Sequence, residues 1–243
     1  MISVETIEYR DDEVTCEGFV AYDKEKIGER PGILIIHDWM GVSPYVRGRA
    51  EELAAMGYLA LTADIYGKGV RPRTEQEAEQ LAAKHRADRP ALRKRARAGL
   101  AALRGNPLTD TERTAAIGYC FGGTAVLELA RSGAEMAGFV TFHGGLETPN
   151  TEDGRNIRGK VLVLHGADDP IVPMPQVLAF QEEMRQARID WQMVFYGGAV
   201  HTFTRQDSGN DPSTGVAYDE KADRRSWQAM RLFFDEIFAS EAR

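Results

Sequence analysis

A cysteine between glycines is the part of this sequence best suited to do chemistry. Gly118, Cys120 and Gly122 alternate at the end of an apolar, β-type run, and Gly123 opens an apolar helical segment. This order indicates a nucleophile elbow, a sharp strand-to-helix turn that holds a strained nucleophile above a sheet. Glycines are expected on both sides because a β-carbon there would strike neighbouring backbone. The start of the following helix would favour a thiolate and a developing oxyanion.

The same pattern also occurs at strand-to-helix junctions that perform no chemistry, where Cys120 would be a small buried hydrophobic residue. The other cysteine, Cys16, falls in an alternating strand pattern and is expected to be structural and half-buried. A disulfide between the two would exclude the elbow. The first residues show no basic-then-apolar leader, so we expect a cytoplasmic protein whose thiols stay reduced.

Composition places the chain among globular proteins with a small-molecule role. Its 243 residues show no linker-like change of composition, so we expect a single domain over 1–243. Hydrophobic residues make up 43% and charged residues 28%, which argues against disordered and membrane classes. The net charge of -7 argues against nucleic-acid binding. The longest apolar runs are strand-sized and too short to cross a bilayer.

The spacing of apolar residues predicts a mostly parallel sheet. Residues 3–10 and 13–22 alternate apolar and polar positions and are predicted to form an antiparallel hairpin. Strands and helices then alternate, which is typical of a parallel sheet with helices on both faces. Strands are predicted at 33–36, 58–63, 114–119, 136–143, 161–165 and 191–196, and helices at 43–56, 74–104 in two pieces, 123–132, 173–186 and 218–238.

Candidate partners for the cysteine come later in the chain, each after a predicted strand. Asp168 and Asp169 follow the strand at 161–165, and His201 lies in a glycine-rich loop after the last strand. Carboxyl ends of parallel strands meet at one sheet edge, so these loops are expected to approach Cys120. A cysteine nucleophile needs a base, and the base needs an acid to hold its tautomer. The order nucleophile, acid, base is that of α/β-hydrolases and favours catalysis.

Three further histidines, His37, His143 and His165, each end an apolar strand at the same edge. They raise the question of a metal site. Their spacing matches no short ligand motif and no cysteine joins them, so we expect no metal and no cofactor. Backbone hydrogen bonding or pocket lining is the role we predict for them.

A basic segment between residues 84 and 97 stands out in this acidic chain. It would mark an anion-binding face, a partner surface or a solvated helix. We favour the solvated helix, because charge runs usually lie on exposed faces. Its cations are Lys84, Arg86, Arg89, Arg93, Lys94, Arg95 and Arg97.

At these residues the chain resembles the dienelactone hydrolase (carboxymethylenebutenolidase-like) family, from the N-terminal hairpin to the last helix. Residues 118–123, GYCFGG, are similar to the family's cysteine elbow. Residues 169–173, DPIVP, and 201–205, HTFTR, are similar to its acid and histidine loops, and 64–66, DIY, to a further segment. The resemblance implies an α/β-hydrolase fold. It also implies Asp169, and not its neighbour, as the acid of the triad.

The resemblance also implies roles for residues around the triad. In the family an acid precedes the oxyanion-hole position on the loop after the first long buried strand, and the matching residue here is Asp38. The resemblance implies an ion pair between Asp38 and Arg205. A substrate carboxylate that binds Arg205 would release Asp38, which could then take the proton of the Cys120 thiol. Alternatively, Asp38 only orders its own loop. The oxyanion hole would be the backbone N–H groups of Trp39 and Phe121. Tyr66 would contact the substrate.

These expectations describe a hydrolase that cleaves an ester or lactone of a small substrate through a Cys120 thioester. If Arg205 binds a carboxylate of the substrate, that substrate is anionic. A second substrate-binding arginine is expected among Arg71, Arg73 and Arg86. One alternative is a general carboxylesterase or thioesterase in which the acid–arginine pair is incidental. Another is a non-catalytic protein that binds a small molecule. No nucleic-acid or membrane partner is expected, and a monomer and a homodimer both fit the sequence.

Overall fold

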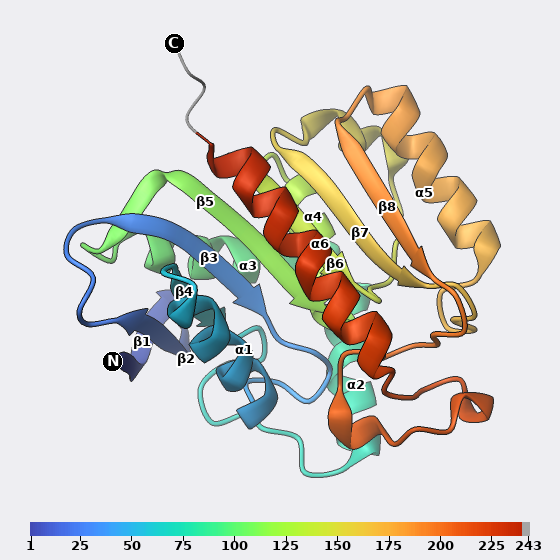
Figure 1. The fold of residues 1–243 in the computed structure, drawn as a ribbon, viewed down its shortest axis with the longest axis horizontal. Coiled ribbons are helices and arrows are strands. Elements are labelled where there is room, and N and C mark those ends of the chain that lie inside the picture. Colours follow the sequence, from blue (N-terminus) through green and yellow to red (C-terminus); the bar gives the residue numbers. More distant parts are fainter. Residues whose placement is uncertain (240–243) are drawn as a thin grey trace.

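A computed structural model describes residues 1–239, which are built around one sheet. Its strands are β1 Ile2–Asp11, β2 Val14–Asp23, β3 Arg30–Ile36, β4 Leu59–Ala63, β5 Thr109–Tyr119, β6 Gly138–Phe142, β7 Lys160–Gly166 and β8 Trp191–Tyr196. They lie in the order β1-β2-β4-β3-β5-β6-β7-β8 (Figure 1). The pairs β1–β2 and β2–β4 are antiparallel, and every other pair is parallel. The predicted parallel sheet with an antiparallel start is confirmed.

Helices cover both faces of this sheet, as predicted. They are α1 Pro44–Ala55, α2 Glu75–Ala87, α3 Arg89–Arg104, α4 Phe121–Arg131, α5 Met174–Ala187 and α6 Glu220–Phe238, with short 3-10 turns η1 Thr151–Asn156, η2 Gln206–Ser208 and η3 Pro212–Thr214. α1 and α6 pack on one face, and α3, α4 and α5 on the other (Figure 1). None of the helices in the described part is long and apolar enough to span a membrane.

Local sequence signals account for the helix boundaries. The predicted break in the long helical segment is confirmed, because α2 ends at Ala87 and the Asp88 side chain accepts a hydrogen bond from the Ala91 N–H at the start of α3. Pro90 stands in the first turn of α3, where its missing N–H costs nothing. Thr74 caps α2 in the same way, through the N–H of Glu77.

Three sequence-based expectations about the elements need correction. α4 begins at Phe121 and not at 123, so both glycines after the cysteine lie inside its first turn. β5 begins at Thr109, five residues before the predicted 114, because its polar first half still pairs with β3 across a register shift. Cys16 is fully buried and not half-buried. It is a free thiol, as is Cys120.

The basic segment is only partly a solvated surface. Arg93 on α3 donates to the buried carboxylate of Glu128 at 2.8 Å, and Arg95 donates to Asp11 at the same distance. Arg89 is itself buried. The prediction of a solvated helix therefore holds for only part of the segment, because Arg93 ties α3 to α4 and Arg95 ties it to the N-terminal hairpin.

Gly122, in the first turn of α4, lets this helix approach β3. A β-carbon there would overlap the carbonyl oxygen of Ile36 and lie 2.5 Å from that of His37. We predict that Gly122→Ala lowers the free energy of unfolding by about 3 kcal/mol or more, because backbone would have to move. Urea unfolding measures this change.

Gly48 on α1 provides the control, since a β-carbon there would meet nothing within 4 Å. Gly48→Ala should raise the free energy of unfolding by about 0.5 to 1 kcal/mol, as expected for alanine in a helix interior. A loss for Gly122→Ala no larger than about 1 kcal/mol would contradict the tight packing of α4 on β3.

Candidate active site

Cys120 lies at a strained turn between β5 and α4. Its φ of 51° and ψ of -113° are unfavourable for any residue with a side chain. The surroundings hold it there: its N–H donates to the Phe142 carbonyl on β6 at 3.0 Å, and its carbonyl accepts from the Gly123 N–H at 3.0 Å. A β-carbon at Gly118 would overlap the Gly122 carbonyl. The elbow geometry predicted from the glycines is present.

His201 reaches this cysteine from the loop after β8. Backbone hydrogen bonds hold the residue on both sides, from its N–H to Gly215 at 3.2 Å and from the Ala217 N–H to its carbonyl at 3.1 Å. Its Nε2 lies 3.1 Å from Cys120 Sγ, and its Nδ1 lies 2.8 Å from Asp169 Oδ2. The three predicted residues are thus in hydrogen-bond contact in the order cysteine, histidine, aspartate.

The Asp169 carboxylate is fixed by the turn on which it lies. Its Oδ1 accepts from the N–H groups of Ile171 at 2.8 Å and Val172 at 3.0 Å, which leaves Oδ2 for His201. Burial alone would raise the pKa of Asp169, but these hydrogen bonds outweigh it and lower the pKa. Asp168 is exposed. The structure therefore brings Asp169, and not Asp168, to the histidine.

His201 is buried, and its environment acts on its charge in two directions. Burial disfavours the imidazolium, whereas the adjacent Cys120 sulfur and the Asp169 carboxylate favour it. The favourable interactions prevail and raise the pKa of His201 to about 10. Since that is above the unfolded value, protonated His201 stabilises the fold at neutral pH, and this contribution is lost as the pH rises from 6.5 towards 10.

His37 orients the peptide group that precedes Trp39. Its Nε2 accepts from the Ile65 N–H at 3.1 Å, so its Nδ1 carries the proton and donates to the Asp38 carbonyl at 2.6 Å. Burial lowers the pKa of His37 to about 4, which keeps the ring neutral. In residues 1–239 neither the N–H of Trp39 nor that of Phe121 donates a hydrogen bond. Both remain available for the predicted oxyanion hole.

The next peptide, between Trp39 and Met40, is held from both ends. The Tyr66 hydroxyl donates to the Trp39 carbonyl at 2.8 Å, and the Met40 N–H donates to Asp38 Oδ1 at 2.8 Å. The Tyr66 ring also packs on the rings of His37 and Phe121, with centroids 4.7 and 5.6 Å apart. Tyr66 thus supports the loop beside Cys120, and its contact with substrate remains a prediction.

Asp38 and Arg205 form the ion pair that the resemblance implies. Arg205 Nη1 donates to Asp38 Oδ2 at 2.5 Å, and the same guanidinium also binds Asp207. Burial raises the pKa of Asp38, although the arginine opposes this shift. Within residues 1–239 the Asp38 carboxylate accepts hydrogen bonds from Arg205 and Met40, whereas the thiol of Cys120 is in contact with His201. Activation of Cys120 by Asp38 therefore stays a prediction.

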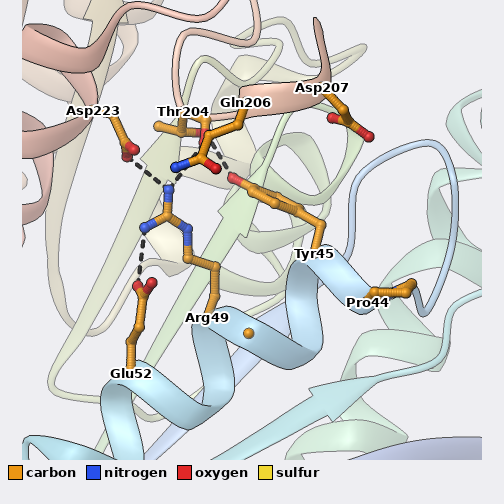
Figure 2. A pocket seen from close by; sticks show the side chains of 9 residues that line it. Pro44, Tyr45, Arg49, Glu52, Thr204, Gln206, Asp207 and Asp223 are labelled. Carbon is orange, nitrogen blue, oxygen red and sulfur yellow. Dashed lines mark hydrogen bonds and ion pairs between the residues drawn. The ribbon is translucent and has the colours of Figure 1, made fainter.

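His143 connects the site to a neighbouring cavity. Its Nε2 lies 2.7 Å from the hydroxyl of Thr204, which is also 2.7 Å from the Tyr45 hydroxyl. Tyr45 and Thr204 line a cavity of about 380 Å³ beside α1 (Figure 2). Arg49 in that cavity is already paired with Glu52 and Asp223 (Figure 2). The lining contains this one cation and three carboxylates, with Asp207 as the third, and the triad residues do not line the cavity.

Two further predictions concern a metal site and a second substrate-binding arginine. Among residues 1–239 no group of three or more metal-binding side chains occurs. Arg71 pairs with Asp64 and donates to nearby carbonyls. Arg73 and Arg86 are exposed. Their contact with substrate remains a prediction.

The predicted backbone hydrogen bonding is confirmed for His37. The sequence did not predict which peptide group this histidine orients. It also gave no signal for Asp207, two residues after Arg205, which resembles any acidic residue of a polar turn. Both act through hydrogen bonds to neighbouring groups, which short motifs do not encode.

The sheet order, the elbow after β5 and the loops that gather at the carboxyl edge of the strands define an α/β-hydrolase. The comparison with known proteins is more specific. A model of the dienelactone hydrolase family matches residues 16–238. The chain belongs to this family, and it is a hydrolase that acts on an ester or lactone.

Relatives are similar over nearly the whole chain. A solved structure named m3DLH is 41% identical with a TM-score of 0.94, and 98% of this chain and 99% of that chain are covered. A dienelactone hydrolase-like promiscuous phosphotriesterase from metagenomic libraries is 39% identical with a TM-score of 0.93 and the same coverage. A "Putative carboxymethylenebutenolidase" of Synechocystis sp. is 23% identical over 86% of this chain and 87% of its own length.

The contrast between His201 and His37 gives a direct test of the site's electrostatics. We predict that the ring of His201 titrates near pH 10, whereas His37 stays neutral down to about pH 4. Nitrogen-15 NMR of the imidazole rings measures both. Cys120→Ala should lower the midpoint of His201 and leave that of His37 in place. A midpoint for His201 near 6.5 in the wild type would contradict the close pairing with Cys120.

Proposed function

We propose that this hydrolase cleaves its ester or lactone through a covalent thioester on Cys120, with His201 as the base and Asp169 orienting the imidazole. The observation that carries the proposal is the continuous contact from Sγ to Nε2 at 3.1 Å and from Nδ1 to Oδ2 at 2.8 Å. Because the carboxylate fixes one proton on Nδ1, Nε2 faces the sulfur and can hold the second, which comes from the thiol.

The first half of the reaction forms the thioester. The Cys120 sulfur attacks the carbonyl carbon while His201 Nε2 holds the proton of the thiol, in keeping with the raised pKa of this histidine. The negative charge that develops on the carbonyl oxygen is bound by the N–H groups of Trp39 and Phe121. When the tetrahedral intermediate collapses, the imidazolium returns the proton to the leaving oxygen. An ester releases an alcohol, whereas an opened lactone keeps its hydroxyl in the same molecule.

The second half hydrolyses the thioester. Water attacks the acyl carbon while His201 accepts its proton, and Cys120 leaves as the acid product forms. The same two N–H groups bind the second oxyanion. All groups in this cycle are protein groups and water, so the proposed cycle needs no cofactor.

The names of relatives support the lactone as one substrate class. The Synechocystis relative has the name "Putative carboxymethylenebutenolidase", and a butenolide is an unsaturated lactone. A general carboxylesterase or thioesterase of the same fold remains the second candidate. It is favoured by one observation, the commitment of Arg205 to two carboxylates of the protein itself. Comparison of matched neutral and anionic esters separates the two.

Replacement of the nucleophile tests the mechanism. We predict that Cys120→Ala and His201→Ala each lower kcat/KM on a small aryl ester by about a thousandfold or more, because each removes a member of the covalent cycle. Steady-state kinetics measure the loss, and circular dichroism checks the fold.

Cys16→Ala is the matched control, since it removes the other thiol from a buried position in β2. It should retain most of the turnover. Wild-type rates in Cys120→Ala would exclude the thioester. A loss of activity in Cys16→Ala equal to that in Cys120→Ala would indicate that the fold, and not the nucleophile, is responsible.

A further inference from the structure

Arg205 is held by two carboxylates of the protein. Its Nε donates to Asp207 Oδ1 at 2.5 Å and its Nη2 to Asp207 Oδ2 at 2.9 Å, which is a bidentate fork. Its Nη1 donates to Asp38 Oδ2 at 2.5 Å. The sequence motif contains Asp38 and Arg205 but gives no role to Asp207. The second acid changes what this arginine offers to a substrate.

The fork that a substrate carboxylate would need is already occupied. A guanidinium has five N–H groups, and a carboxylate is bound best by two parallel ones. Asp207 takes the parallel pair on Nε and Nη2, and Asp38 takes a donor on Nη1. The ring of Tyr45 lies 5.7 Å from the guanidinium carbon and covers one face. An incoming carboxylate would find the fork of Nε and Nη2 occupied and would have to share the remaining donors with Asp38 and Asp207.

The charge of this group points the same way. One guanidinium with two carboxylates has a net negative charge when both acids are ionised. The hydrogen bonds from Arg205 lower the pKa of Asp207, so this acid is ionised at neutral pH. With Asp38 ionised as well, a third carboxylate placed next to the group would be repelled, and the repulsion is strengthened because the arginine and Asp38 side chains are only 16% and 4% exposed.

We propose that Asp207 is a specificity-determining residue that directs this hydrolase to neutral esters and lactones and against substrates with a carboxylate near the reacting carbonyl. The inference rests on the proposed function, since it names the substrate class for the same site. It also assigns Arg205 a different use: here the arginine holds Asp38 in place and does not recruit an anion.

If Asp207 had a purely structural role, its removal would not change the preference between the two classes of substrate. If this acid only fixed the Arg205 side chain, its removal would affect neutral and anionic substrates alike. The Asp207 side chain is 66% exposed, and exposed ion pairs contribute little to folding stability. Asp207→Asn should therefore fold, and its effect can be measured in the intact protein.

The experiment compares one scissile bond in two charge states. The substrates are the p-nitrophenyl monoester of succinate, which has a free carboxylate, and its methyl-capped counterpart, which is neutral. Wild type should prefer the neutral ester after correction for spontaneous hydrolysis. Asp207→Asn should raise the ratio of kcat/KM for acid over neutral ester by about tenfold, mainly through a lower KM for the acid, because a fork to the guanidinium becomes free.

Asp211→Asn is the matched control. It removes one negative charge from the same segment, but the hydrogen bonds of Asp211 within residues 1–239 stay in its own turn, where its carboxylate accepts from the Ser213 N–H. It should leave the ratio unchanged. A second variant tests the route, because Asp207→Asn combined with Arg205→Gln should lose the gain for the acid.

Two results would overturn the inference: a wild type that prefers the acid, or an Asp207→Asn protein in which both substrates change by the same factor. Calorimetric binding of the same two esters to Cys120→Ala, with and without Asp207→Asn, tests it independently of turnover. If wild type turns over neither ester and the acid still binds about tenfold tighter after Asp207→Asn, the specificity role stands and the proposed function fails.

Discussion

The backbone of Cys120 is the constraint on which the rest of this structure depends. A positive φ at a residue with a β-carbon costs of the order of 1 to 3 kcal/mol, and it persists only where the surroundings impose it. Here the Phe142 carbonyl on β6 accepts a hydrogen bond from the Cys120 N–H. Gly118 and Gly122 let the start of α4 pack closely against β5 and β3. The strain places Sγ beyond the carboxyl edge of the sheet. Every other part of the site is then a loop that leaves the same edge.

Burial is balanced against hydrogen bonding at each polar residue of this edge. Asp169 keeps its charge because two backbone N–H groups and His201 bind it. His201 is charged in an equally buried position because an acid and a sulfur flank it. Among residues 1–239 the ring of His37 hydrogen-bonds backbone groups and no acid side chain, and burial lowers its pKa. The same side chain thus serves as a base in one loop and as a neutral support in the next.

The sequence was sufficient for features that depend on local pattern and chain order. The glycines around Cys120 predicted the elbow, and the alternation of strands with helices predicted a parallel sheet whose loops converge. It was insufficient where long-range partners decide. The cations of α3 were expected in solvent, but the carboxylates of Asp11 and Glu128, distant in the chain, bind two of them. Arg205 and Asp207 are close in the chain, and their bidentate pairing is a local interaction. The effect proposed for it on substrate choice also depends on Asp38, which is 167 residues before Arg205.

The central claim is that Cys120 forms a thioester with the acyl half of the substrate. The most direct measurement is intact-protein mass spectrometry after acid quench during turnover of a p-nitrophenyl ester, followed by peptide mapping. The account predicts a mass increase equal to the acyl group, located on the peptide that contains Cys120 and absent from Cys120→Ala. An acyl group on any other residue, or a protein that releases p-nitrophenol in steady turnover without a burst or an adduct, would contradict it.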